Sequence, residues 1–402
     1  MANQRKDPPA IEGGIPVRDQ LLPFFRPAID DNDVTVVGDA LRSGWLTMGP
    51  QTRRFENELA DYFGSRNVVA VNSCSAAMFL ALASLGIGKG DEVVTSALTF
   101  ASTVQAIIHT GATPVLADIE LDTFGPSPAE FAKQTNSSTK AYMPVHFGGQ
   151  ACRISEIMEL AKDSGALVVE DAAHSFGAVA DGKKVGCFGD ATAFSFYATK
   201  NLTTGEGGCL STDDDELTQR LRTLSYHGMS DDSWDRHTDR GSWFYDVTAL
   251  GYKFNMSDLL AALGLSQLGR IDLLLEGRRV VAEKYIDRLA GSDYLELPRT
   301  GENNLHTWHL FVILLNLDTL TIDRDQFVKA MTAENIGCSV HFIPIYKHGF
   351  FDAFTDGSAS YPNCEAYYSR CLSLPIFPGM TDDDVETVVC ALDRIAAYYS
   401  KA

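Results

Sequence analysis

Lys200 stands in the segment AFSFYATKNLTTGEGG, between an aromatic run and a glycine-rich turn. Phe194, Phe196 and Tyr197 precede it closely, and their apolar surface would keep water from the ammonium group and lower its pKa. A lysine with a lowered pKa is a nucleophile that forms Schiff bases with carbonyl compounds. The alternative is a lysine with a buried stem and its charge at the surface.

A carboxylate lies earlier in the chain, where the apolar run ALVVED ends in Asp171. The carboxyl end of a parallel strand points into the crevice where α/β sheets bind ligands. Pyridoxal phosphate (PLP) needs such a carboxylate at its ring nitrogen, to keep the pyridinium protonated. A helix-capping or salt-bridged aspartate is the alternative. His174 follows in the next turn and could reach the ring hydroxyl, unless it is a structural histidine.

The segment VNSCSAAMF has the pattern of a strand, a tight turn of small residues and a helix. Free backbone amides of Ser75 and Ala76 at that helix start would bind an anion without a basic side chain. Ser195 could add a hydroxyl donor, and Phe100 could stack on a flat ring. An amine, a carboxylate, an anion site and an aromatic face together match the aldehyde, nitrogen, phosphate and ring of PLP.

The elements around these residues alternate between strand and helix periodicity. Strands are predicted at 68–72, 92–96, 113–119, 140–147 and 166–173, and helices at 53–64, 75–86, 99–111 and 154–165. Helices of this length between strands indicate βαβ units. We therefore expect an α/β fold whose central sheet is mainly parallel and flanked by helices.

The order of elements changes toward the C-terminus. One long helix over 258–289 is expected to connect two domains, and it is followed by predicted strands at 308–316 and 338–344 and predicted helices at 324–337 and 381–399. This pattern is typical of a smaller α+β unit. We therefore expect a flexible N-terminal arm over 1–20, a large domain over 21–275 and a small C-terminal domain over 276–402.

Charge excludes several classes of partner. The 402 residues include 33 Lys+Arg against 53 Asp+Glu, a formal net charge of −20. Nucleic acid and anionic membrane surfaces are therefore disfavoured, because both are bound through Lys and Arg. No apolar run is long enough to span a membrane. The 8 cysteines include no Cys-x-x-Cys pair, so we expect buried thiols in the cytoplasm and no metal site.

Two further patterns have structural interpretations. The glycines of Gly86–Gly90 follow an apolar helix and precede a strand, which is the reverse of a dinucleotide-binding motif, and so predict a helix-ending turn. The acidic runs Asp213–Glu216 and Asp382–Asp384 each follow a threonine and precede a helical pattern, so helix capping is favoured over metal binding.

The chain resembles the DegT-type sugar aminotransferases, PLP-dependent enzymes of the aspartate aminotransferase fold (PLP-transferase fold type I). The similarity runs from about residue 22 to the C-terminus. It rests on ordered motifs: WLTMGP (45–50), NSCSAA (72–77), PVHFGGQ (144–150), VVEDAAHSFGA (168–178), FSFYATKNLTTGEGG (194–208) and GYKFNMSDLL (251–260).

The resemblance assigns a role to each matching residue. It implies that Lys200 forms the Schiff base with the cofactor and later moves a proton, and that Asp171 pairs with the pyridine nitrogen. His174 would lie near the ring hydroxyl, where many relatives have glutamine. The remaining implied cofactor contacts are Ser75, Ala76 and Ser195 at the phosphate, Phe100 on the ring, and Asn255, donated to the phosphate across the interface of a homodimer.

Substrate contacts implied by the resemblance are Met48, His341 and Tyr346, with structural packing as the alternative for His341 and Tyr346. A sugar diphosphate in a strongly acidic protein also needs a local cation, for which Lys253 and Lys347 are the candidates. The chain has SCSAAM where the family usually has SGTAAL, and Lys253-x-Asn255 where many members have Asn-x-Arg. The second departure is similar to the branch that aminates C4.

The function that the resemblance implies is transfer of an amino group from L-glutamate to a nucleotide-diphosphate-linked ketosugar, at C4. Amination at C3 or of another cyclic ketone, and a non-catalytic sensor that retains the fold, are the alternatives. A related PLP-dependent 3-dehydratase would have histidine at the position of Lys200, and an NAD-dependent dehydrogenase would need a fingerprint that the chain lacks.

Overall fold

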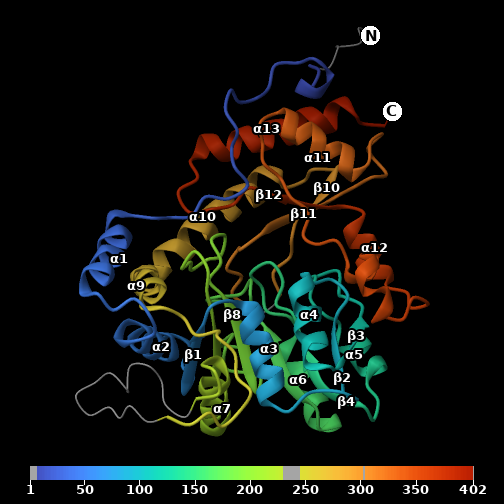
Figure 1. The fold of residues 1–402 in the computed structure, drawn as a ribbon. Coiled ribbons are helices and arrows are strands. Elements are labelled where there is room, and N and C mark those ends of the chain that lie inside the picture. Colours follow the sequence, from blue (N-terminus) through green and yellow to red (C-terminus); the bar gives the residue numbers. More distant parts are fainter. Residues whose placement is uncertain (1–6, 230–244, 302–303, 402) are drawn as a thin grey trace, which may run out of the picture.

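The computed structural model describes residues 7–229, 245–301 and 304–401, and its centre is a seven-stranded sheet (Figure 1). The strands follow one another in space in the order β1-β9-β8-β5-β4-β2-β3. Their bounds are β1 (Asn67–Val71), β2 (Glu92–Ser96), β3 (Thr113–Ala117), β4 (Thr139–Met143), β5 (Leu167–Asp171), β8 (Ala191–Ser195) and β9 (Gly208–Thr212).

The direction of the strands confirms the predicted sheet. β8, β5, β4, β2 and β3 run parallel to one another. β9 pairs antiparallel with both β1 and β8, so β1 again runs in the common direction. The carboxyl ends of the parallel strands therefore meet at one edge of the sheet, where ligands bind in α/β folds.

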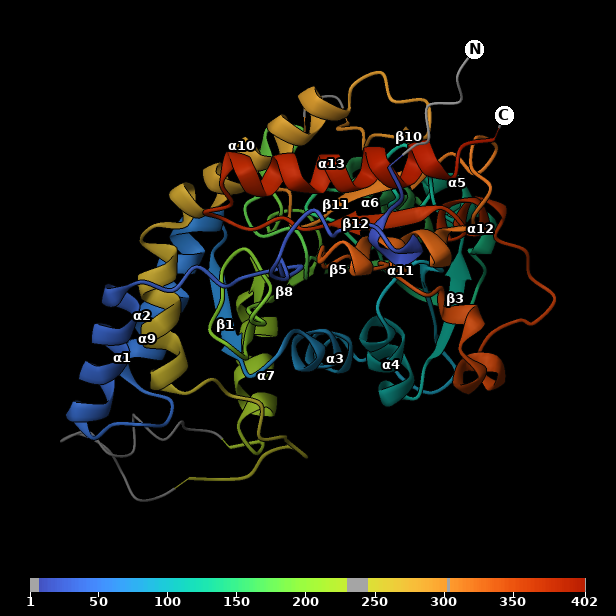
Figure 2. The same cartoon turned by 90° about the horizontal axis from the view of Figure 1, so that it is seen from above.

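Both faces of the sheet are covered, which explains why most positions of its strands are buried. In β1, Val68 and Ala70 belong to one hydrophobic core, whereas Val69 and Val71 belong to the other. One face packs on α3 (Cys74–Ser84), α4 (Ala101–Thr110) and α7 (Asp215–Ser225). The opposite face packs on α2 (Pro50–Phe63), α5 (Pro128–Gln134), α6 (Ile154–Ser164) and α9 (Asp258–Leu268). Figure 2 shows α3 and α4 side by side.

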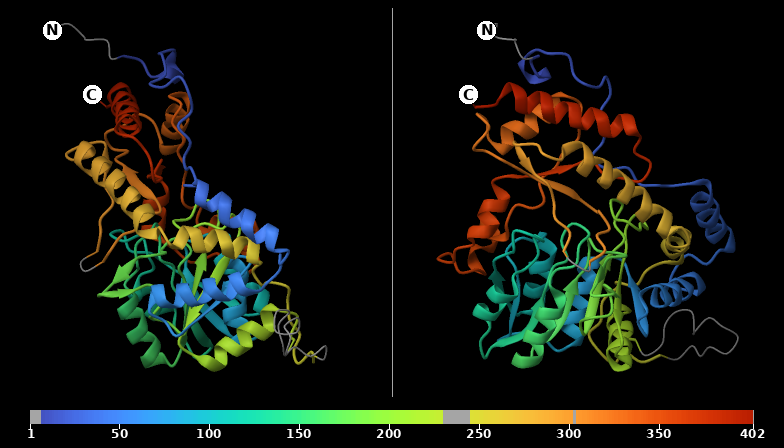
Figure 3. Two further views of the ribbon diagram at one scale, coloured as in Figure 1. Left: turned by 90° about the vertical axis from the view of Figure 1, so that its left-hand side faces the viewer. Right: turned by 180° about the vertical axis from the view of Figure 1, so that it is seen from behind.

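A second sheet lies above the first in Figure 1 and has its own hydrophobic core. It consists of antiparallel strands β10 (Leu295–Glu296), β11 (Phe311–Leu315) and β12 (Cys371–Leu374), packed on α10 (Ile271–Leu289), α11 (Arg324–Ala333) and α13 (Asp382–Tyr398). Helix α10 runs obliquely between this part and the lower sheet (Figure 3). The exact domain limits stay a prediction.

The remaining elements are short or peripheral. They are α1 (Asp31–Ser43), α12 (Pro362–Tyr368), the hairpin β6 (Val179–Ala180) and β7 (Lys183–Lys184), and the 3-10 helices η1 (Ala10–Glu12), η2 (Ile345–Lys347) and η3 (Gly349–Ala353). No helix among the described residues is both long and apolar enough to cross a membrane. Within the same residues, no cluster of three or more His, Cys, Asp or Glu side chains could hold a metal ion. All eight cysteines are free thiols.

The local predictions of caps and turns are confirmed. Asp214 caps α7 by accepting from the amides of Glu216 and Leu217, at 2.7 and 2.9 Å. Thr381 caps α13 in a reciprocal capping box with Asp384. Gly86 adopts a φ of +80° after α3, where L residues with side chains are strained, as a helix-ending turn requires.

Two predicted elements are wrong. The expected single helix over 258–289 is two helices, α9 and α10, which separate at Gly269 and Arg270. The predicted strand over 338–344 is irregular and keeps one bridge, between Ser339 and Ser373. After Ser339 it leaves the small sheet and crosses to the end of β2, where the Ile345 amide donates to the Ala97 carbonyl, at 3.1 Å.

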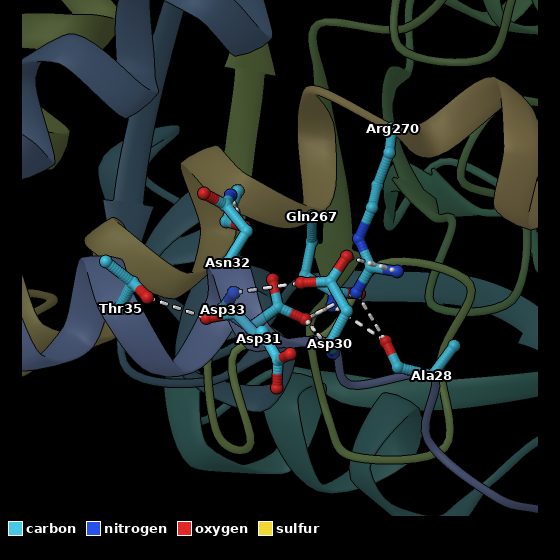
Figure 4. A network of polar contacts seen from close by, with 9 residues as sticks. Ala28, Asp30, Asp31, Asn32, Asp33, Thr35, Gln267 and Arg270 are labelled. Carbon is cyan, nitrogen blue, oxygen red and sulfur yellow. Dashed lines mark hydrogen bonds and ion pairs between the residues drawn. The ribbon is translucent and has the colours of Figure 1, made fainter.

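The break between α9 and α10 has a physical cause, which Figure 4 shows. The guanidinium of Arg270 forms ion pairs with Asp30 (3.2 Å) and with the buried carboxylate of Asp33, and donates to the Ala28 carbonyl (2.6 Å). Gln267 donates to the same two acceptors, Asp33 (2.7 Å) and Ala28 (3.0 Å). These contacts fix the segment that leads into α1. The residues that precede this segment line the cavity described below.

Replacing Arg270 with alanine should destabilise the protein. The change leaves the buried Asp33 carboxylate without its cation, and breaking a buried pair in this way costs about 3 kcal/mol. Urea unfolding followed by tryptophan fluorescence measures the effect. The matched control is Arg42→Ala, which breaks the exposed pair with Asp39 and should cost less than about 1 kcal/mol. Equal losses in the two variants would contradict the role given to the network.

Candidate active site

A cavity of ≈480 Å³ opens at the carboxyl edge of the central sheet, against residues of the C-terminal part. Its wall brings together most of the predicted site residues: Ser75, Phe100, Asp171, His174, Ser195, Lys200 and His341. Asp171 is the last residue of β5 and Ser195 the last residue of β8, the neighbouring parallel strand. The strand ends thus place residues that are distant in sequence around one space.

Asp171 is buried and its carboxylate is held by donors on both oxygens. Oδ1 accepts from the Ala173 amide (3.1 Å), and Oδ2 accepts from the Thr103 hydroxyl (2.7 Å). The Thr103 oxygen lies 2.6 Å from that of Thr99. Asp171 is 4% exposed, so these two donors fix the orientation of its carboxylate at the cavity wall.

Lys200 lies in the turn after β8, and its side chain faces the cavity. The turn is closed by bonds from the Lys200 amide to the Tyr197 carbonyl and from the Phe196 amide to the Gly207 carbonyl, both 2.9 Å. Burial lowers the pKa of Lys200 to about 8, and the nearby Arg278 cation contributes, although Asp171 opposes the effect. A substantial fraction of this amine is therefore neutral near neutral pH, as a nucleophile must be.

The start of α3 forms an anion site beside this lysine. Within the residues that the structure describes, the amides of Cys74 and Ser75 donate to no backbone or side-chain acceptor. The Ala76 amide differs from the prediction: it is not free, because it donates to the capping Ser73 hydroxyl (3.1 Å). Gly208 allows β9 to approach this helix start, since a Cβ there would lie 2.6 Å from the Cys74 nitrogen.

Ser195 completes the anion site from the other side. Its oxygen accepts from the Tyr197 amide at 3.3 Å, which leaves the hydroxyl proton to donate to a ligand. Unpaired helix-start amides beside a hydroxyl donor suit a phosphate. The residues of the wall therefore fit PLP: an amine for its aldehyde, a carboxylate for its ring nitrogen and an anion site for its phosphate.

His174 is a neutral donor in this arrangement. Its Nδ1 accepts from the Gly148 amide (3.3 Å), so the ring proton is on Nε2. Burial, together with the charges of Lys200 and His341, places the pKa of His174 well below its usual value. A neutral imidazole with a fixed N–H can donate to a ring hydroxyl or phenolate without adding positive charge.

Two residues of the site had no recognisable signal in the sequence. His309 lines the cavity with its ring 4.5 Å from that of His174, and burial keeps its pKa well below the usual value. Arg278 is buried behind the wall and donates to the carbonyls of Thr199 (3.4 Å), Trp308 (3.3 Å), His309 (3.2 Å) and Ile376 (3.0 Å). Arg278 lies in a predicted helix and His309 in a predicted strand, and both positions have the pattern of ordinary core residues.

Four predicted site residues do not line this cavity: Ala76, Asn255, Met48 and Tyr346. Asn255 pairs with Val71 and accepts from Lys253 Nζ (2.7 Å). Tyr346 stacks on Tyr361, with ring centroids 4.7 Å apart.

Lys347, predicted as a cation for the diphosphate, also lies outside the cavity wall. It forms an ion pair with Glu365, at 2.7 Å. The roles given to Lys347 and to Ala76, Asn255, Met48 and Tyr346 stay predictions.

Comparison with known proteins identifies relatives along nearly the whole chain. The family model DegT/DnrJ/EryC1/StrS aminotransferase family matches residues 27–393. The spore coat polysaccharide biosynthesis protein SpsC of Bacillus subtilis (strain 168) is 47% identical over 380 residues, which cover 94% of this chain and 98% of SpsC.

Solved structures agree with this family. Spr1654 from Streptococcus pneumoniae in its PLP form superposes with a TM-score of 0.86 at 30% identity, covering 94% of this chain and 99% of the other, and it is also known in its PMP form. Helicobacter pylori PseC, an aminotransferase involved in the biosynthesis of pseudoaminic acid, gives a TM-score of 0.87 at 26% identity, covering 94% and 100%. The chain thus belongs to the DegT/DnrJ/EryC1/StrS family and is a PLP-dependent aminotransferase.

Proposed function

We propose that this enzyme transfers an amino group from L-glutamate to C4 of a ketosugar carried by a nucleotide diphosphate. The observation that carries the proposal is the placement of Lys200 and Asp171 beside an unpaired anion site in one cavity. The name of SpsC refers to polysaccharide biosynthesis and that of PseC to pseudoaminic acid, which supports a sugar substrate. The variant Lys253-x-Asn255 supports C4.

When bound, PLP withdraws electrons from the carbon next to the transferred nitrogen, so that a C–H bond there becomes acidic. Lys200 Nζ accepts a proton as the neutral amine and returns it as the ammonium, and a pKa of about 8 suits both directions near neutral pH. The Asp171 carboxylate would hold a proton on the ring nitrogen of the bound cofactor. Ser75, Cys74 and Ser195 hold the phosphate by their amides and hydroxyl.

The proposal includes a homodimer with a shared active site. Lys200 is the one Lys or Arg side chain among the described residues of the cavity wall. The cofactor phosphate and the sugar need additional contacts, and we propose that a second copy supplies them, with Asn255 at the phosphate and Met48 at the entrance. Free thiols support the cytoplasm as the location.

Capture of PLP by the cofactor-free protein should depend on pH through Lys200. Because burial lowers the pKa of Lys200 to about 8, the neutral amine increases as the pH rises through that value, and so should the rate of capture. Stopped-flow absorbance measures this rate, and Lys200→Arg gives the background from surface lysines. A midpoint at the usual value of 10.5 would contradict the assigned environment.

The function itself is tested by its two half-reactions. L-glutamate alone should remove the visible absorbance of the PLP-loaded enzyme, and a nucleotide-linked 4-ketosugar should restore it. A panel with matched 3-keto and 4-keto sugars on the same nucleotide distinguishes the carbon, and we expect at least about tenfold higher kcat/KM for the 4-keto compound.

Each outcome of this panel has a distinct meaning. Restoration by the 3-keto compounds alone would contradict the choice of C4. Failure of every donor amino acid to change the absorbance would contradict amino transfer as a whole. Lys200→Ala is the control, because a sensor that only retains the fold would keep its function in that variant.

A further inference from the structure

The buried chain of hydroxyl groups behind Asp171 is not used by the proposed reaction. Thr103 donates to Asp171 Oδ2 at 2.7 Å, and the oxygens of Thr103 and Thr99 are 2.6 Å apart. Thr103 is fully buried and Thr99 is 1% exposed. These two threonines come from the start of α4 and the turn before it, whereas Asp171 ends β5.

The direction of the hydrogen bonds between these groups follows from the number of protons that each group can donate. Thr103 donates its single hydroxyl proton to Oδ2 of Asp171. Thr103 then has only lone pairs to offer, so the proton between the two threonines belongs to Thr99. The result is an ordered relay, Thr99 to Thr103 to Asp171, in which each donor polarises the next bond.

The relay also links two faces of the cofactor site. Phe100 is the N-cap of α4, and Thr99 lines the cavity beside it. The same helix start therefore carries the aromatic ring for one face of the cofactor and, one turn later, the hydroxyl that fixes the carboxylate. A rotation of the carboxylate would break the bonds to Thr103 and to the Ala173 amide together.

We infer that Thr103 is a positioning residue: with Thr99 as its donor, it fixes the orientation of the Asp171 carboxylate toward the ring nitrogen of PLP. This inference rests on the proposed function, since it needs Asp171 to face that nitrogen. Thr103 touches neither cofactor nor substrate and acts through the carboxylate. Thr99, one bond further away, has the smaller effect.

The test compares Thr103→Val with Thr103→Ser in the PLP-loaded enzyme. Valine keeps the shape and removes the proton donor, and loss of one bond to a charged group should lower kcat by about tenfold or more. KM for the sugar should stay within about twofold, because Thr103 does not line the cavity. The visible absorbance maximum of the bound cofactor should shift in the valine variant, and serine should restore both properties.

The matched control is Thr95→Val. Thr95 is also fully buried near the site, but its hydroxyl donates to the Met143 carbonyl (2.8 Å) and not to Asp171. It should keep the wild-type absorbance maximum and kcat. Wild-type spectrum and kcat in Thr103→Val, or a Thr103→Ser variant as impaired as the valine variant, would overturn the inference.

The outcome for the relay is distinguishable from that for the proposed function. If the wild-type enzyme shows neither half-reaction, the proposed function fails, and the variants are not needed for that conclusion. If the wild-type enzyme shows both half-reactions while Thr103→Val matches the Thr95→Val control, the relay alone fails.

Discussion

A buried carboxylate at the end of a central strand is the constraint on which this site depends. Asp171 is taken out of solvent at the end of a central strand, so its charge must be met by fixed donors and by a nearby cation. The fold supplies a backbone amide from the following turn, a hydroxyl from α4 and the amine of Lys200 from the turn after β8. The strand order of the sheet makes these donors converge.

The same burial that keeps Asp171 fixed makes Lys200 reactive. Two effects act on the pKa of Lys200 in opposite senses: the Asp171 carboxylate favours the ammonium, while loss of water favours the amine. Burial is the larger effect, and it lowers the pKa of Lys200 to about 8. Arg278 adds a second cation whose terminal nitrogens donate to carbonyls from three segments, so it also joins the two hydrophobic parts of the molecule.

Much of the fold and site was predictable from residues whose surroundings dictate them. Apolar β-branched runs between helices predict a sheet covered on both faces, and the acid at the end of such a run must lie at the ligand-binding edge. Lys200, Asp171 and Ser195 could therefore be placed near one another before the structure was seen. The capping residues were also predictable, because capping depends on local sequence alone.

The missed features depend on long-range contacts. Arg270 ends a helix because Asp30 and Asp33, far away in sequence, bind its guanidinium, and nothing in the helical pattern shows this. Residues 338–344 have strand composition but cross toward the large sheet. Thr103 looks like an ordinary threonine in an amphipathic helix until its carboxylate partner is known.

The most direct test of the account is to find where PLP attaches. Borohydride reduction of the PLP-loaded protein, followed by digestion and peptide mass spectrometry, locates the modified lysine. The account predicts one phosphopyridoxyl group per chain, on the peptide that contains Lys200. Attachment at another lysine, or no attachment under conditions in which the enzyme transfers amino groups, would contradict it.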